Sequence, residues 1–398
     1  MRSSRVICSA PIGLPSGGRG FHGTRRTTAH AFTRHPICDE AFDVVPPVRI
    51  RALVSGPRAL VSSPAGIPRV GPARWIAGAT VTALLLLLVV SRIAPQSFVD
   101  LPARLALGPL LLGFGFLLLE SVFAALRLHV LALPRRDARA AYEVTAWHAL
   151  WLLALPARLG DVAWVLLMRS RYAWRSGAAL GCALFQRLLD LGVVLVFVAV
   201  GLPAVPGVPG GPYRLAGVLA TGAVVAVAVL ALEGWTTWLA GLLRRGVHRP
   251  RGWRRRLFRT LMHARVWSRH VRSRGLRLLA LTLTAASGGA LAAAYLCVLR
   301  ALGIELGGAQ ALFLVGATQL VVAIPIQSVG GLGVFEAGLA GLLVLLGHAP
   351  GDAAMAALLL RAVSVSVMLT FWLPAAARAL WSRRMRQVTA QPFGEGPT

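Results

Sequence analysis

Long apolar segments alternate with short arginine-rich stretches along most of the chain. They lie near residues 75–91, 105–133, 143–168, 177–201, 214–242, 278–300, 309–346 and 353–377. A helix needs about 20 predominantly apolar residues to cross the hydrocarbon core of a bilayer, and most of these segments reach that length. The pattern therefore predicts an all-α polytopic membrane protein.

Two of the segments, 143–168 and 309–346, contain residues that end helices. Pro156 and Gly160 divide the first into pieces too short to cross a bilayer alone. A loop with one proline and three glycines, at residues 325–333, divides the second in the same way. We expect each segment to form two half-helices.

The distribution of arginine predicts how these two segments lie in the membrane. Arginines flank residues 143–168 on both sides, whereas the ends of residues 309–346 carry little positive charge. Positive loops stay in the cytoplasm, so both ends of the first segment are expected inside and both ends of the second outside. Each would then be a re-entrant helical hairpin. With six full spans, both chain termini become cytoplasmic.

The order of spans and hairpins predicts an internal repeat within a transmembrane domain at residues 71–386. Residues 75–201 form span, span, hairpin and span, beginning inside, and residues 214–377 form the same series, beginning outside. Such an inverted repeat lets transporters expose one central site to each side of the membrane in turn.

The two ends of the chain lack helical or strand periodicity. Residues 1–70 and 387–398 are therefore expected to be disordered. A second interpretation stays open for the first of them, because no methionine occurs between Met1 and Met168 and translation could start later.

Composition supports a membrane protein and argues against binding of nucleic acid. Of 398 residues, 56% are hydrophobic and 14% charged, with a mean hydropathy of +0.68. The net charge of +28 comes from arginines that cluster between apolar segments, as cytoplasmic loops require. Four cysteines, Cys8, Cys38, Cys182 and Cys297, show no metal-binding or disulfide spacing. No metal or cofactor is expected.

Three blocks of sequence carry a resemblance to a known family. They are LPARLGD at 155–161, QRLLDLG at 186–192 and IPIQSVGGLGVFEAGL at 324–339. In these blocks the chain resembles the lysylphosphatidylglycerol synthase transmembrane-region family, also called flippase-like integral membrane proteins, over about residues 75–385. The resemblance implies a lipid flippase or another lipid-handling membrane protein. Some members also carry an aminoacyl-transferase domain, which is not expected here.

The chain departs from the family pattern at two positions. The block usually written E-R-L-L-D begins with Gln186, and the position four after Gly160, often arginine in relatives, is Trp164. Both changes remove a charge, so the headgroup preference of relatives does not transfer directly to this chain.

Charged residues of the first half are candidates for substrate binding. Arg158, at the tip of the first hairpin, could bind a phosphate or pair with Asp161, a carboxylate favoured at a helix N-terminus. Gln186, Arg187 and Asp190 lie within one turn of a helix. Either Arg187 and Asp190 form a salt bridge, or Arg187 contacts a lipid headgroup while Asp190 orients it.

The second hairpin contributes Glu336 and the glycines of its loop. Glu336 could couple transport to protons or bind a headgroup amine, or it could be the structural partner of Arg361 or Arg127. Gly331 and Gly333 would let the backbone approach a ligand or another helix closely.

Glu120 and Arg127 are seven residues apart in one span and are expected on one inward face. We expect the protein to move a lipid or lipid-linked headgroup across the cell membrane, between the two hairpin tips. The expected partners are membrane lipids, anionic or aminoacylated, and lipid-synthesis enzymes. The oligomeric state stays open.

Two alternatives to transport remain. The protein could be a membrane-embedded enzyme that uses Asp161, Asp190 and Glu336 as acid or base, although no nucleophile or metal motif supports this. It could also be a non-transporting subunit of lipid or lipid-linked glycan synthesis.

Overall fold

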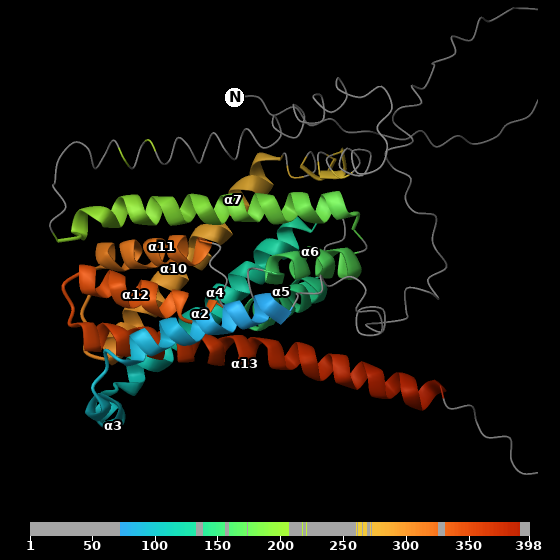
Figure 1. Cartoon of the computed structure of the whole chain (residues 1–398). Helices are drawn as coiled ribbons and strands as arrows, with labels where there is room; N and C mark the ends of the chain where they lie inside the picture. The colour runs from blue at the N-terminus through green and yellow to red at the C-terminus, as the bar shows by residue number, and fades with distance from the viewer. Residues whose placement is uncertain are drawn as a thin grey trace, which may run out of the picture. The chain divides into compact units, whose positions relative to one another are not determined.

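The computed structural model describes residues 72–132, 138–155, 159–172, 174–206, 273–324 and 331–390, with ten further residues between 217 and 271. Every regular element in these ranges is a helix, which confirms the predicted all-α class there (Figure 1). Residues 1–70 and most of the predicted span at 214–242 lie outside the described ranges.

Four helices among the described residues are long and apolar enough to cross a membrane. They are α4 (Leu107–Leu131), α7 (Ser176–Gly201), α10 (Arg274–Ala301) and α13 (Pro350–Ala390). Helix α2 (Pro72–Val90) covers the first predicted span with 19 residues, and the 3-10 turn η3 (Leu202–Ala204) extends α7. The protein is therefore a multi-pass membrane protein.

Both interrupted segments form two short helices, as their proline and glycine residues predict. The first gives α5 (Ala138–Ala154) and α6 (Leu159–Tyr172), and the second gives α11 (Gly308–Ala323) and α12 (Val334–Leu345). With 12 to 17 residues, each is shorter than the roughly 20 that a crossing requires. In both segments the two short helices pack against each other.

One helix was not predicted, and another is longer than predicted. Helix α3 (Pro95–Arg104) was not expected, because its ten residues mix polar and apolar side chains instead of forming an apolar segment. Pro95 lies in its first turn, where the missing N–H of proline costs nothing. Helix α13 runs from Pro350 to Ala390 with Pro374 inside it, so it extends beyond the predicted span at 353–377.

Helices α4 and α10 pack along each other over much of their length. Helix α11 packs against α7, α10 and α12, α5 packs against α4 and α13, and α12 also contacts α2 (Figure 1). The largest apolar core lies among α10, α11, α12 and α13 and includes Tyr295, Leu314, Leu339 and Leu360. Helices α11 and α12 thus form part of the core between the long helices, whereas α5 packs against α4 and α13, and α6 packs against α7.

A glycine permits the close approach of α11 to α7. A Cβ atom on Gly316 would lie 2.8 Å from Cγ2 of Val198 and 2.9 Å from the carbonyl oxygen of Val194. Small residues let helix backbones approach in this way in membranes.

We predict that Gly316→Ala destabilises the protein by about 1 to 3 kcal/mol, because the added methyl group forces α11 away from α7. Gly341→Ala is the matched control, since a Cβ at that helical position meets nothing within 4 Å. Thermal unfolding of the detergent-solubilised variants measures the difference. Equal melting temperatures for the two variants would contradict the close approach.

Candidate functional site

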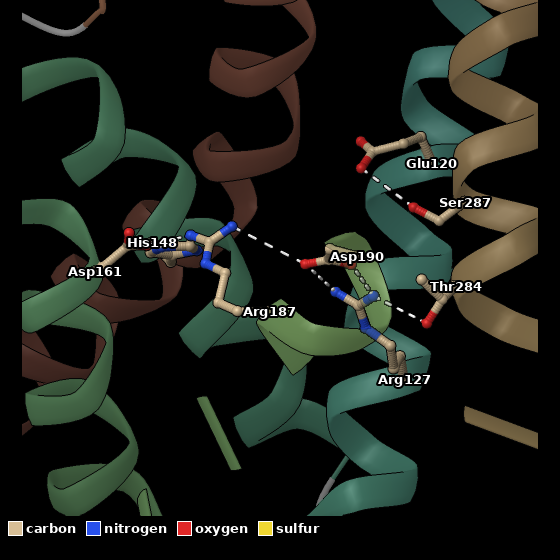
Figure 2. A network of polar contacts seen from close by, with 8 residues as sticks. All are labelled: Glu120, Arg127, His148, Asp161, Arg187, Asp190, Thr284 and Ser287. Carbon is tan, nitrogen blue, oxygen red and sulfur yellow. Dashed lines mark hydrogen bonds and ion pairs between the residues drawn. The ribbon is translucent and has the colours of Figure 1, made fainter. Parts of the chain in front are cut away.

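Polar and charged side chains from five helices meet in a continuous chain of contacts in the helical bundle. We call this chain the central network. Figure 2 shows its members together with Glu120 and Ser287. In order of contact they are His148 of α5, Asp161 of α6, Arg187 and Asp190 of α7, Arg127 of α4 and Thr284 of α10.

Arg127 anchors one end of the central network. Its guanidinium forms an ion pair with Asp190 and donates a hydrogen bond to Oγ1 of Thr284 at 3.0 Å. Only 8% of Arg127 is exposed. A buried charge needs such partners because its desolvation otherwise costs several kcal/mol, about 3 to 5 when one member of a buried pair is removed. These contacts tie α4 to α7 and α10.

Arg187 stands between the two aspartates of the central network (Figure 2). It forms an ion pair with Asp161, and its Nη1 lies 3.9 Å from Oδ2 of Asp190. The predicted Arg187–Asp190 salt bridge is therefore present, but each residue also has a partner on another helix. Two guanidiniums and two carboxylates balance in charge.

His148 closes the other end of the central network, and the sequence analysis missed it. Its Nε2 lies 3.3 Å from Oδ1 of Asp161, and its ring stacks on Trp164 with centroids 4.8 Å apart. An ionisable residue within an apolar segment was the available signal. Asp161 lies in the first turn of α6, where the helix dipole favours a carboxylate.

The central network is partly exposed although Arg187 lies near the middle of a spanning helix. The side chains of Arg187, Asp190 and Asp161 are 44%, 33% and 30% exposed, against 9% for Arg127. Arg187 is the twelfth of the 26 residues of α7, close to the middle of that span. A charge at this depth must face water, protein or a polar ligand, because hydrocarbon does not solvate it.

Glu120 lies two turns before Arg127 on α4. Its carboxylate accepts hydrogen bonds from Ser287 of α10 at 3.3 Å and from Ser121 at 3.4 Å. Arg127 also contacts α10, through Thr284. The two side chains therefore share the inward face that their spacing predicts.

A second cluster surrounds Glu336, which is fully buried. One carboxylate oxygen accepts the N–H of Gly333 at 2.5 Å, and the other lies 3.4 Å from Nε of Arg361. The Arg361 guanidinium also lies over the ring of Phe335, 5.4 Å from its centroid. Of the two structural partners considered for Glu336, Arg361 is the one it contacts, since Arg127 binds Asp190.

The backbone at Gly333 explains part of this geometry. Gly331 and Gly333 have φ values of +69° and +84°, the left-handed region that glycine adopts without strain. A Cβ on Gly333 would lie 2.6 Å from Cβ of Leu85 in α2. Glu336 caps α12 through the Gly333 N–H, a capping-box spacing that the sequence analysis did not use.

The remaining predicted residues take separate places. Gln186 is 2% exposed, and its Nε2 lies 3.9 Å from Sγ of Cys182 within α7. Arg158 lies outside the described residues. In the part of the chain that the structure describes, no three His, Cys, Asp or Glu side chains are grouped to hold a metal ion.

We predict that Asp190→Ala destabilises the fold because it leaves the Arg127 charge buried without its carboxylate. The loss should fall somewhat below the about 3 to 5 kcal/mol of a fully buried pair, since Asp190 is one-third exposed. Asp100→Ala, which breaks an exposed i,i+4 pair with Arg104, is the control and should change stability by less than about 0.5 kcal/mol. Thermal unfolding in detergent compares the two, and similar melting temperatures would mean that Asp190 does not compensate Arg127.

Comparison with known proteins identifies the family of the chain. The family model for the lysylphosphatidylglycerol synthase TM region matches residues 75–372. No curated protein and no solved structure matches the chain. The matched range includes all helices from α4 to α12 and the central network within them. It covers well over half of the sequence, and the chain therefore belongs to the lysylphosphatidylglycerol synthase transmembrane-region family.

Proposed function

We propose that this protein is a transporter that moves a lipid or lipid-linked headgroup across the cell membrane. One observation carries the proposal: Arg187 and Asp190 are charged and partly exposed near the middle of the spanning helix α7, and Arg187 pairs with the partly exposed Asp161 of α6. Maintaining exposed charge at that depth is costly, and proteins retain such groups where a polar substrate passes.

The surroundings of Arg187 suit an amphipathic substrate. Leu184 and Leu191, one turn before and after Arg187 on the same face of α7, are 51% and 44% exposed. A guanidinium can hold a phosphate through two parallel hydrogen bonds. A phospholipid could place its phosphate on Arg187 and its acyl chains along the leucines. The phosphate would then replace Asp161 as the partner of Arg187.

The proposed topology has six spans and two re-entrant hairpins, with both termini in the cytoplasm. The short lengths of α5, α6, α11 and α12 support the hairpins, as does the packing of each pair on itself. Helix α2 and the segment at 214–242 would complete the six spans. The orientation of the hairpins and termini follows from the arginine-rich flanks of the first hairpin.

The packing of the helices supports the inverted repeat as part of this proposal. Helix α11 contacts α7, and its counterpart α5 contacts α13, the counterpart of α7. Helix α10 contacts α7, and likewise α4 contacts α13. Each contact that a helix of the second half makes with α7 thus has a counterpart, in which the equivalent helix of the first half contacts α13. An inverted repeat of this kind could open a central path to either side of the membrane.

We expect Arg187→Gln to slow transport of an anionic phospholipid at least tenfold. Charge-assisted hydrogen bonds contribute about 1.5 to 3 kcal/mol, and about 1.4 kcal/mol corresponds to one factor of ten in rate. The assay adds fluorescent phosphatidylglycerol to the outer leaflet of liposomes that contain the protein. It measures how fast half of the label moves to the inner leaflet, where an impermeant reductant cannot reach it.

Two controls accompany this measurement. Arg104→Gln removes an exposed arginine outside the network and should transport at the normal rate. Fluorescent glucosylceramide, which has no phosphate, should move slowly with every variant. Equal movement of both lipids, or a normal rate for Arg187→Gln, would contradict the proposal. A new lipid species detected by mass spectrometry in the liposomes would favour the enzymatic alternative instead.

A further inference from the structure

The two ion pairs of the short helices occupy equivalent positions in the two halves of the chain. Asp161 is the third residue of α6 and binds Arg187, the twelfth residue of α7. Glu336 is the third residue of α12 and contacts Arg361, the twelfth residue of α13. In each half, an acid in the first turn of the second short helix thus binds an arginine of the next long helix.

The spacing along the chain agrees with this equivalence. The acid precedes the arginine by 26 residues in the first half and by 25 in the second. The helix that carries the acid packs against the helix that carries the arginine in both halves. The two pairs are therefore the same structural feature, formed twice.

The two pairs differ strongly in exposure. The side chains of Asp161 and Arg187 are 30% and 44% exposed, whereas those of Glu336 and Arg361 are 1% and 15% exposed. The ring of Phe335 also lies against the Arg361 guanidinium. One pair is thus open in this structure and its counterpart is closed.

We propose that Arg361 is a second binding site for the anionic headgroup, equivalent to Arg187, and that one site opens as the other closes. The inference rests on the proposed transport function and specifies its route. The phosphate of a phospholipid is bound by Arg187 in the present state and by Arg361 in the alternate state. In the present state the Glu336 carboxylate occupies the place beside Arg361 that the phosphate takes in the alternate state.

The physical basis is an exchange of conformations between the two halves. Halves of the same construction can adopt each other's conformation, so a protein with one open and one closed half has an alternate state in which the roles are reversed. Each state has one open and one closed ion pair, and a change at either ion pair shifts the relative populations of the two states. Removing the charge that closes Arg361 should therefore open that site and close the Arg187 site.

Two cysteine reporters at equivalent positions can measure this exchange. Leu191→Cys and Val365→Cys each lie four residues after one of the two arginines, on the same helical face. Each is introduced singly into a chain whose four natural cysteines are replaced by alanine, after that chain has been shown to keep the melting temperature of the natural protein. A hydrophilic thiol reagent labels the cysteine where water reaches it. We expect Leu191→Cys to react about tenfold faster than Val365→Cys.

Glu336→Gln is the decisive variant, because glutamine still accepts the Gly333 N–H but no longer carries the charge that holds Arg361. We expect labelling of Val365→Cys to rise and that of Leu191→Cys to fall, which changes their ratio about tenfold. Asp161→Asn, in the equivalent position, should lower the labelling of Val365→Cys. Glu305→Gln, an exposed acid outside both pairs, should leave the ratio unchanged.

The outcomes separate this inference from the transport proposal. If both reporters change together in Glu336→Gln, or if the ratio stays the same, the exchange is overturned even where phospholipid is transported. If the ratio shifts as expected but no phospholipid moves, the exchange stands and the transport proposal fails. Should Glu336→Gln not fold, the effect of Asp161→Asn on Val365→Cys decides the question alone.

Discussion

The cost of placing charge in hydrocarbon governs how this bundle is assembled. Arg127 cannot remain buried in α4 without a counter-charge, so α7 must lie where Asp190 reaches it, and α10 must lie where Thr284 reaches it. Apolar packing between helices is weakly directional in a membrane, because lipid chains are as apolar as leucine. The ion pairs therefore determine which helices are neighbours and at what height, while glycines such as Gly316 determine how closely they approach.

The same constraint explains why the short helices occur inside the bundle. A helix that ends within the membrane exposes unpaired N–H groups, which are tolerated only where protein or water satisfies them. The first turns of α6 and α12 each carry an acid, which stabilises the positive end of the helix dipole. The acid also binds an arginine of the following long helix. In each half, the same acidic residue thus stabilises the helix N-terminus and forms the ion pair.

Much of this architecture could be predicted from the sequence, because apolar length and helix-breaking residues are local properties. The division of the two interrupted segments follows from Pro156 and from the loop at 325–333, whereas Gly160 lies inside α6 as its second residue. The partners of the charged residues could not be predicted in the same way. Helical spacing identifies the contact between Arg187 and Asp190, but Asp161 and Arg127 reach these residues from other helices. His148 was missed because its partner became apparent only when α5 and α6 packed together.

The lengths of the two acids explain why equivalent ion pairs differ in exposure. Glutamate has one more methylene group than aspartate, so the Glu336 carboxylate can reach back to the Gly333 N–H while its other oxygen faces Arg361. The guanidinium, which lies over Phe335, encloses this carboxylate within the protein, where Oε1 faces Arg361 as an ion pair without a hydrogen bond. Asp161 instead shares one oxygen between His148 and Arg187. Arg187 consequently keeps donor capacity for another anion, and this pair is the one suited to be open.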